Sequence, residues 1–143
     1  ATSTSASSGS GWVAACAVDT TGQWAAVGGG RIRNAVFGQS AGFLAAFHLG
    51  SRTLCSSRRT AANVQALMYQ QDGLVSVGNE PYVRMWERTD LSNPRSQMAA
   101  SSPSLFSVSC SSSDLKCICV TGSSPVVDLY GDNGLKIHSL WFE

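Results

Sequence analysis

From residue 11 onward, short apolar or alternating runs end at Gly, Asn, Asp, Ser or Pro. Such period-two segments, bounded by turn residues, predict β-strands. Helices are disfavoured because the runs are too short to repay helix nucleation, and Gly or Asn interrupts them. Only FLAAFHL (43–49) fits a helix as well as a strand. The pattern predicts twelve strands, at 12–19, 23–29, 42–49, 52–59, 64–70, 74–79, 82–88, 95–101, 105–111, 116–122, 126–131 and 135–142.

The residues between these segments predict tight turns, so successive strands should pair as antiparallel meanders. Thr21-Gly22 and Asp132-Asn133-Gly134 are the clearest examples. Asn and Gly tolerate the positive φ that a type I′ hairpin turn requires.

A four-strand unit occurs three times. Small or β-branched residues run into a glycine at 25–29, 75–79 and 119–123. The strand that follows each motif closes on an aromatic residue, and Phe47, Trp86 and Tyr130 are 39 and 44 residues apart. A repeat of 40 to 45 residues is typical of WD40-type β-propeller blades. The sequence therefore predicts an all-β fold of about three four-stranded antiparallel blades, at 12–60, 64–101 and 105–143.

Three blades do not close a propeller, which usually has four to eight. We therefore expect a fragment, an isoform, or a chain that needs partner blades. Residues 1–11, rich in Ser and Thr, are expected to form a disordered lead-in. Two features depart from WD40 repeats: no Gly-His dipeptide opens a blade, and Glu87 follows Trp86 where Asp is usual. The usual Asp-His-Ser-Trp hydrogen-bond chain is therefore not expected.

The blades also resemble a particular WD40 family. The similarity lies in five stretches, GWVAACAVDTTGQWAAVGGG, FLAAFHLGSRT, MYQQDGLVSVGNEPYVRMWE, SSPSLFSVSCSSS and VVDLYGDNGLKIHSLWF. In order and spacing they resemble the C-terminal blades of the THO complex subunit 6 family, and they fall within residues 11–143. The resemblance implies a nuclear scaffold subunit of a THO/TREX-like complex in mRNA processing and export. Its partners would be other subunits, with RNA engaged indirectly.

Composition limits the other function classes. The formal net charge is +1 and 13% of residues are charged, so the basic stripe of non-specific nucleic-acid binding is not expected. No apolar run reaches the roughly 20 residues of a membrane-spanning helix. Five irregularly spaced cysteines, without a signal peptide, favour a reducing compartment, the cytosol or nucleus.

Gly38-Gln39-Ser40-Ala41-Gly42 spells G-x-S-x-G, the nucleophile elbow of serine hydrolases. That motif needs a strand, a sharp turn and a helix in a parallel sheet, whereas only meander is predicted downstream. His138 is the only later histidine. We interpret Ser40 as part of an expanded loop between two strands and keep a serine hydrolase as an alternative.

Other chemistry-bearing residues have simpler explanations. Cys117 and Cys119 share one face of a strand, but no second cysteine pair completes the four ligands of a zinc site. His48 and His138 are isolated. No Walker-type or G-x-G-x-x-G loop follows a strand. We therefore expect no metal, cofactor, small-molecule substrate or catalytic activity.

A propeller without catalytic groups presents surfaces, so we expect a non-catalytic scaffold. An adaptor of another complex, a ubiquitin ligase or a chromatin assembly, is the main alternative. Blade order places the connections at 31–41, 60–63, 79–81 and 123–125 on one face. Because Arg and Tyr often anchor interfaces, the predicted partner-binding residues are Arg31, Arg33, Arg59, Asn79, Glu80 and Tyr82.

Overall fold

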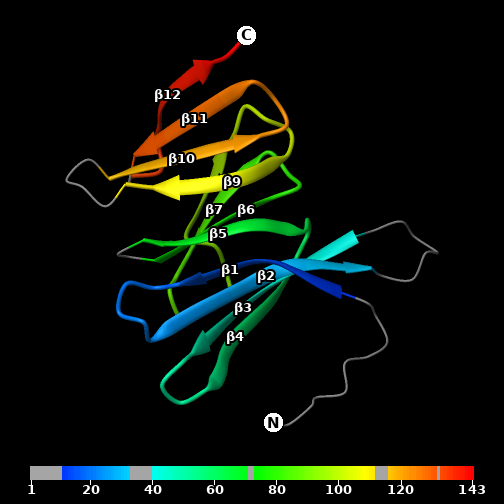
Figure 1. The fold of residues 1–143 in the computed structure, drawn as a ribbon, viewed down its shortest axis with the longest axis vertical. Coiled ribbons are helices and arrows are strands. Elements are labelled where there is room, and N and C mark those ends of the chain that lie inside the picture. The colour runs from blue at the N-terminus through cyan, green and yellow to red at the C-terminus, as the bar shows by residue number, and fades with distance from the viewer. Residues whose placement is uncertain (1–10, 33–39, 71–72, 112–115, 132) are drawn as a thin grey trace.

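The computed structural model describes residues 11–32, 40–70, 73–111, 116–131 and 133–143. These residues form twelve strands in three four-stranded antiparallel sheets, shown from bottom to top in Figure 1. The first sheet contains β1 (Gly11–Val18), β2 (Trp24–Ile32), β3 (Ser40–His48) and β4 (Thr53–Thr60). The second contains β5 (Val64–Gln70), β6 (Gly73–Gly78), β7 (Tyr82–Trp86) and β8 (Ser96–Ala99). The third contains β9 (Leu105–Cys110), β10 (Cys117–Gly122), β11 (Val126–Gly131) and β12 (Lys136–Trp141).

The predicted fold is confirmed. All twelve predicted strands are present, with ends shifted by at most three residues, and each sheet keeps its strands in chain order. The predicted lead-in falls almost wholly on residues 1–10, which lie outside the described residues.

The ambiguous segment FLAAFHL is a strand and not a helix. It lies in β3, between β2 and β4. Leu44 and Ala46 point to the second sheet and are fully buried, whereas Phe43 and Phe47 lie on the opposite face and are half-buried. A central strand has two faces to pack, so its sequence is apolar throughout and does not alternate.

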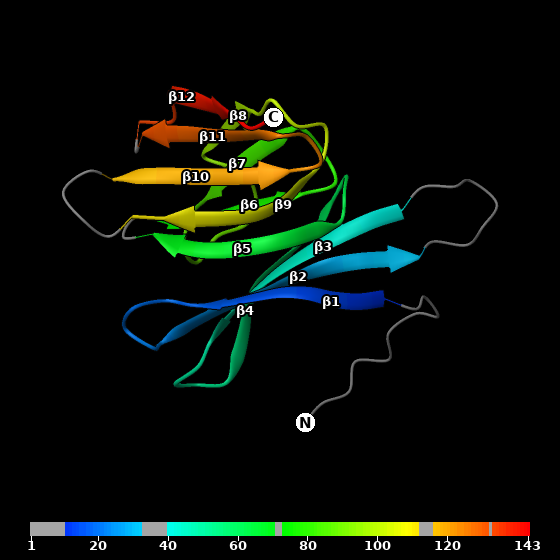
Figure 2. The same cartoon turned by 45° about the horizontal axis from the view of Figure 1, so that its top comes forward.

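Two apolar cores hold the sheets face to face, and the stack is visible in Figure 2. Between the first and second sheets, Leu44 and Ala46 pack with Leu74 and Trp86. Between the second and third, the core consists of Val75, Val77, Val83, Met85, Met98, Leu105, Ile118, Val120 and Tyr130. Burying these side chains stabilises the stack, at about 1.5–3 kcal/mol for each large one. The second sheet is thus covered on both faces.

One part of the WD40 hydrogen-bond chain is present, against expectation. In the second sheet the indole Nε1–H of Trp86 donates to Oγ of Ser76 at 2.8 Å. The bond links adjacent strands and needs no Gly-His dipeptide. The Ser-Trp step therefore forms even though the histidine step has no residue to supply it.

Candidate protein-interaction surface

Connections between strands and between sheets meet at one end of the molecule. The backbone N–H of Asn79, after β6, donates to the carbonyl of Asn63, before β5, at 3.1 Å. Ser123, after β10, donates in the same way to Ser104, before β9, at 2.9 Å. We call residues 61–63, 79–81, 100–104 and 123–125 the loop face. These backbone bonds hold its connections in fixed positions.

Three of the predicted site residues lie together: Asn79 and Glu80 belong to the loop face, and Tyr82 adjoins it as the first residue of β7. The exposed Asn79 accepts a hydrogen bond from Ser104 Oγ at 2.6 Å. Glu80 forms an ion pair with Arg84. The Arg84 guanidinium lies 5.9 Å from the ring centroid of Tyr82, within cation–π range.

Arg84 therefore joins Glu80 to Tyr82, and sequence reasoning missed it. The available signal was its spacing, because residues 82 and 84 of a strand share a face. Burial, followed by the nearby charge of Arg58, lowers the pKa of Arg84. Tyr82 keeps 36% of its surface exposed. The result is an aromatic side chain held in place by its neighbours yet open to a partner.

Two other predicted residues line a separate cleft. Arg31 and Arg59 border an open cleft of about 560 Å³ on the first sheet, together with Trp12, Val13 and Phe43. Among the described residues, no carboxylate lies within ion-pair distance of Arg31 or Arg59. Arg33 lies outside the described residues. The structure thus divides the predicted set between the loop face and this arginine cleft.

Ser40 is not in the expected loop. It is the first residue of β3, and its backbone pairs with Ile32 of β2. The connection between the strands spans 33–39 and not 31–41, because β2 and β3 continue their pairing beyond Gly30 and Gly42. Gly38 and Gln39 lie outside the described residues. Since a strand and not a helix follows Ser40, the strand-turn-helix frame of a nucleophile elbow is missing there.

The cysteines and histidines are spread over six strands of the first and third sheets. Cys117 and Cys119 are half-buried on one strand, and burial raises the pKa of Cys119. The centroids of the His48 and Trp24 rings are 4.9 Å apart, and His138 is exposed. Within the described ranges, no three His, Cys, Asp or Glu side chains gather as a metal site. In the same ranges there is no helix long and apolar enough to span a membrane.

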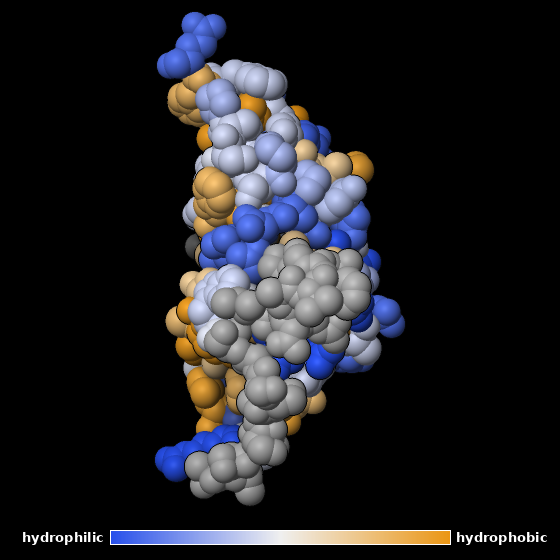
Figure 3. Space-filling view, turned by 90° about the vertical axis from the view of Figure 1, so that its right-hand side faces the viewer, coloured by the Kyte–Doolittle hydropathy of each residue, from blue (hydrophilic) through white to orange (hydrophobic). Residues whose placement is uncertain are grey.

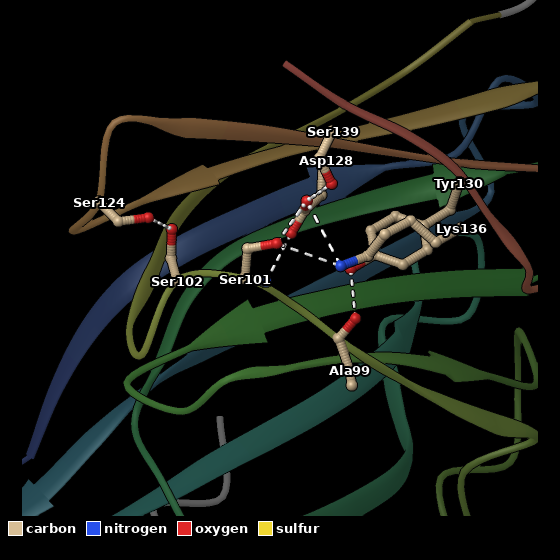
Figure 4. A network of polar contacts seen from close by, with 8 residues as sticks. All are labelled: Ala99, Ser101, Ser102, Ser124, Asp128, Tyr130, Lys136 and Ser139. Carbon is tan, nitrogen blue, oxygen red and sulfur yellow. Dashed lines mark hydrogen bonds and ion pairs between the residues drawn. The ribbon is translucent and has the colours of Figure 1, made fainter. Parts of the chain in front are cut away.

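A buried carboxylate network joins the second and third sheets (Figure 4). Asp128 of β11 accepts hydrogen bonds from the Ser101 backbone at 2.6 Å and from Ser139 Oγ at 2.6 Å. Lys136 lies 3.5 Å from the same carboxylate. Burial by itself would raise the pKa of Asp128, but the hydrogen bonds and the Lys136 charge outweigh it and lower this pKa. The network fixes the connection between these two sheets.

Comparisons with known proteins address the fold. No family model matches the sequence, and no curated protein matches it. Among solved structures, the WD40 domain of Toxoplasma gondii coronin is similar with a TM-score of 0.67 and 14% identity, over 94% of this chain and 40% of that one. Hsv2 from Kluyveromyces marxianus is similar with a TM-score of 0.57 and 12% identity, over 93% and 40%.

The chain therefore spans 40% of the length of both structures. The TM-scores establish a shared fold. Because the identities are so low, the function of this chain has to be argued from its own residues. The three four-stranded sheets keep their strands in chain order, and the structural similarity covers more than nine tenths of the sequence. They have the fold of WD40-type β-propeller blades.

Proposed function

We propose that the protein is a non-catalytic interaction scaffold that binds protein partners through its loop face. The observation that carries the proposal is the Glu80, Tyr82 and Arg84 cluster. Its ion pair and cation–π contact hold an exposed tyrosine in place before a partner arrives. A side chain that is already ordered loses little conformational entropy on binding, and Tyr is often an interface anchor.

Of the remaining predicted residues, Asn79 adjoins this cluster, and Arg31 and Arg59 lie at the separate arginine cleft. Asn79 presents a polar group beside the cluster, and its contact with Ser104 keeps it in place. Arg31 and Arg59 supply positive charge at the arginine cleft, and Arg33 belongs to the same proposed set. Charged residues at the edge of an interface mainly affect association rate and specificity.

The assembly we propose is a THO/TREX-like complex of nuclear mRNA processing and export. Support for this comes from the five sequence stretches that resemble the THO complex subunit 6 family. RNA would be reached through other subunits, because a net charge of +1 provides little phosphate affinity. An adaptor role in a ubiquitin ligase or chromatin complex is the alternative, and the identity of the partners separates the two.

The test is affinity purification of the tagged chain from nuclear extract, with RNase treatment and mass spectrometry. We expect THO subunits to be recovered independently of RNA. Tyr82→Ala should reduce that recovery, whereas Tyr82→Phe, which keeps the ring, should retain it. Recovery of ubiquitin-ligase or chromatin subunits would replace the THO assignment. Recovery of no partner, or equal recovery with Tyr82→Ala, would contradict the proposed loop-face scaffold.

A further inference from the structure

The three sheets pack at two junctions, which we call the first junction, between the first and second sheets, and the second junction, between the second and third. Arg84 and Asp128 occupy equivalent positions at them. Each lies two residues before the buried aromatic of its third strand, Trp86 or Tyr130, and shares that residue's face toward the preceding sheet. The same position therefore carries a guanidinium at the first junction and a carboxylate at the second.

Arg58 and Met98 form a second equivalent pair, on the last strands of their sheets. Each pairs with the residue three positions before the third-strand aromatic of its own sheet. Met98 packs in the core that contains Tyr130. The guanidinium of Arg58 lies 5.4 Å from the centroid of the Trp86 ring, within cation–π range. Both side chains thus reach the aromatic of the next sheet, but at the first junction the one that does so is charged.

The first junction therefore brings two guanidinium groups together. Arg84 lies on the same face of β7 as Trp86, over which Arg58 lies. Burial, and after it the charge of Arg58, lowers the pKa of Arg84. Glu80 balances the charge of Arg84. Among the residues with described positions, no carboxylate lies within ion-pair distance of Arg58, so one positive charge at this junction is left unmatched.

The second junction shows what a carboxylate does at this place in the fold. Asp128 accepts hydrogen bonds from the backbone N–H of Ser101 at 2.6 Å and from Ser101 Oγ at 2.8 Å. It thereby ties the end of the second sheet to the third. The first junction has cationic donors instead, and a carboxylate supplied by another molecule would complete the same kind of contact there.

The donors of the first junction are accessible. Arg58 is half-buried and donates to the carbonyl of Ser92, and a guanidinium has five N–H donors, so others remain. The Arg84 side chain keeps 18% of its surface exposed and lies beside the exposed ring of Tyr82. Figure 3 looks onto the loop face and shows hydrophilic surface across the middle of the molecule, at the level of the second sheet. A partner that docks beside Tyr82 therefore meets a polar surface with excess positive charge.

We propose that the protein partner places an Asp or Glu side chain between Arg58 and Arg84, with its neighbouring residues on the ring of Tyr82. A carboxylate brings the single negative charge that the unmatched Arg58 requires, and guanidinium groups bind carboxylates through paired hydrogen bonds. A phosphate group, with about two negative charges, would leave excess negative charge beside Glu80. The inference deepens the proposed function, on which it rests, by naming the chemistry of the partner at the loop face.

An NMR titration of the isotopically labelled chain with tetraglutamate tests the proposal, with tetraglutamine as the neutral control. We expect tetraglutamate to shift the Nε–Hε signal of Arg58 and the backbone signal of Tyr82. Added sodium chloride should reverse these shifts, because salt screens charge pairs. No shift at Arg58, or equal shifts with tetraglutamine, would overturn the proposal. So would tighter binding of inorganic phosphate than of tetraglutamate at the same signals.

Arg58→Met is the sharpest variant, because Met98 shows that methionine packs at the equivalent position. It should fold, as an unchanged backbone spectrum outside the first junction would show. Measured at the Tyr82 signal, it should bind tetraglutamate at least about tenfold more weakly, as expected for loss of a charged hydrogen bond. Arg58→Lys keeps the charge without the planar fork and should bind with intermediate affinity.

Arg52→Met is the matched control, since it makes the same substitution at the exposed turn between β3 and β4. It should bind tetraglutamate as the wild type does. Unchanged binding by Arg58→Met, or an equal loss of binding by Arg52→Met, would overturn the assignment to the first junction.

Partner recovery separates this inference from the proposed function. We expect Tyr82→Ala and Arg58→Met to reduce recovery of protein partners from nuclear extract, and Arg52→Met to leave it unchanged. If Tyr82→Ala reduces recovery and Arg58→Met does not, the loop-face scaffold stands and the acidic contact is overturned. If tetraglutamate binds at Arg58 and no protein partner is recovered, the scaffold fails and the carboxylate site stands.

Discussion

The Nε1–H of Trp86 donates a 2.8 Å hydrogen bond to Oγ of Ser76. Trp86 is 1% exposed and Ser76 6%, so neither group has water as an alternative partner. The bond ties β6 to β7 on the side that packs against the first sheet. In the first sheet, Phe47 stands where Trp86 stands in the second and has no N–H to bond. Within the described residues, this indole–hydroxyl bond therefore belongs to the second sheet, which packs between the other two.

Removing the Ser76 hydroxyl should destabilise the protein. Ser76→Ala leaves a buried indole N–H without a partner, which costs about 1–3 kcal/mol. The free energy of unfolding, measured by urea titration, should fall by that amount. Ser107→Ala, at an exposed strand position, is the control and should change it little. An unchanged free energy for Ser76→Ala would mean that the bond contributes nothing measurable.

Stability should depend on pH through Asp128. The pKa of Asp128 in the folded chain lies below its ordinary value of 3.8. The ionised carboxylate therefore stabilises the folded state. This contribution is fully present at pH values above 3.8 and is lost as the pH falls through the lower folded-state pKa. The measurement compares urea titrations at about pH 6 and about pH 3. At the higher pH, Asp128→Asn should have a lower free energy of unfolding than the wild type. On acidification, the variant should lose less of that free energy than the wild type does.

Part of the acid sensitivity should survive in Asp128→Asn. Asp19 is also buried, and its pKa is also lowered: burial by itself raises it, but bonds from Thr21, Trp24 and Gln23 outweigh that effect. A pH dependence identical to that of the wild type would contradict the assignment to Asp128.

Cysteine reactivity should follow burial. Desolvation raises the pKa of Cys110 to about 11, so its thiolate is scarce at neutral pH. Cys55 is exposed. We expect iodoacetamide at neutral pH to alkylate Cys55 well before Cys110, as followed by peptide mass spectrometry. Equal rates in the folded chain would mean that Cys110 is not buried in solution, and unfolding in urea, as the control, should equalise them.

Ser40 should not react as an activated nucleophile. Its place at the start of β3, followed by a strand, lacks the strand-turn-helix frame of a nucleophile elbow. We expect an active-site fluorophosphonate to leave Ser40 unlabelled under conditions that label a serine hydrolase run in parallel. Labelling that disappears in Ser40→Ala would restore the hydrolase alternative.

The sequence alone determined the strands, their order and the three-sheet division. Period-two patterns and turn residues act over a few residues. The turn at Thr21-Gly22 can therefore be predicted from the local sequence, and so can the shared strand face of Tyr82 and Arg84. The same locality explains the error at Ser40, because the extra pairing of β2 and β3 depends on backbone bonds across the sheet and not on any local residue type.

Only the tertiary structure decided which distant residues meet. Ser101 and Asp128 are 27 residues apart, and nothing in either neighbourhood indicates that the hydroxyl and backbone N–H of one bind the carboxylate of the other. Arg31 and Arg59 are also distant in sequence, and the pairing of strands in the first sheet brings both to one cleft. Tyr82 lies in the second sheet, apart from that cleft. Such contacts are set by the stacking of whole sheets, since burial and partner choice depend on every strand at once.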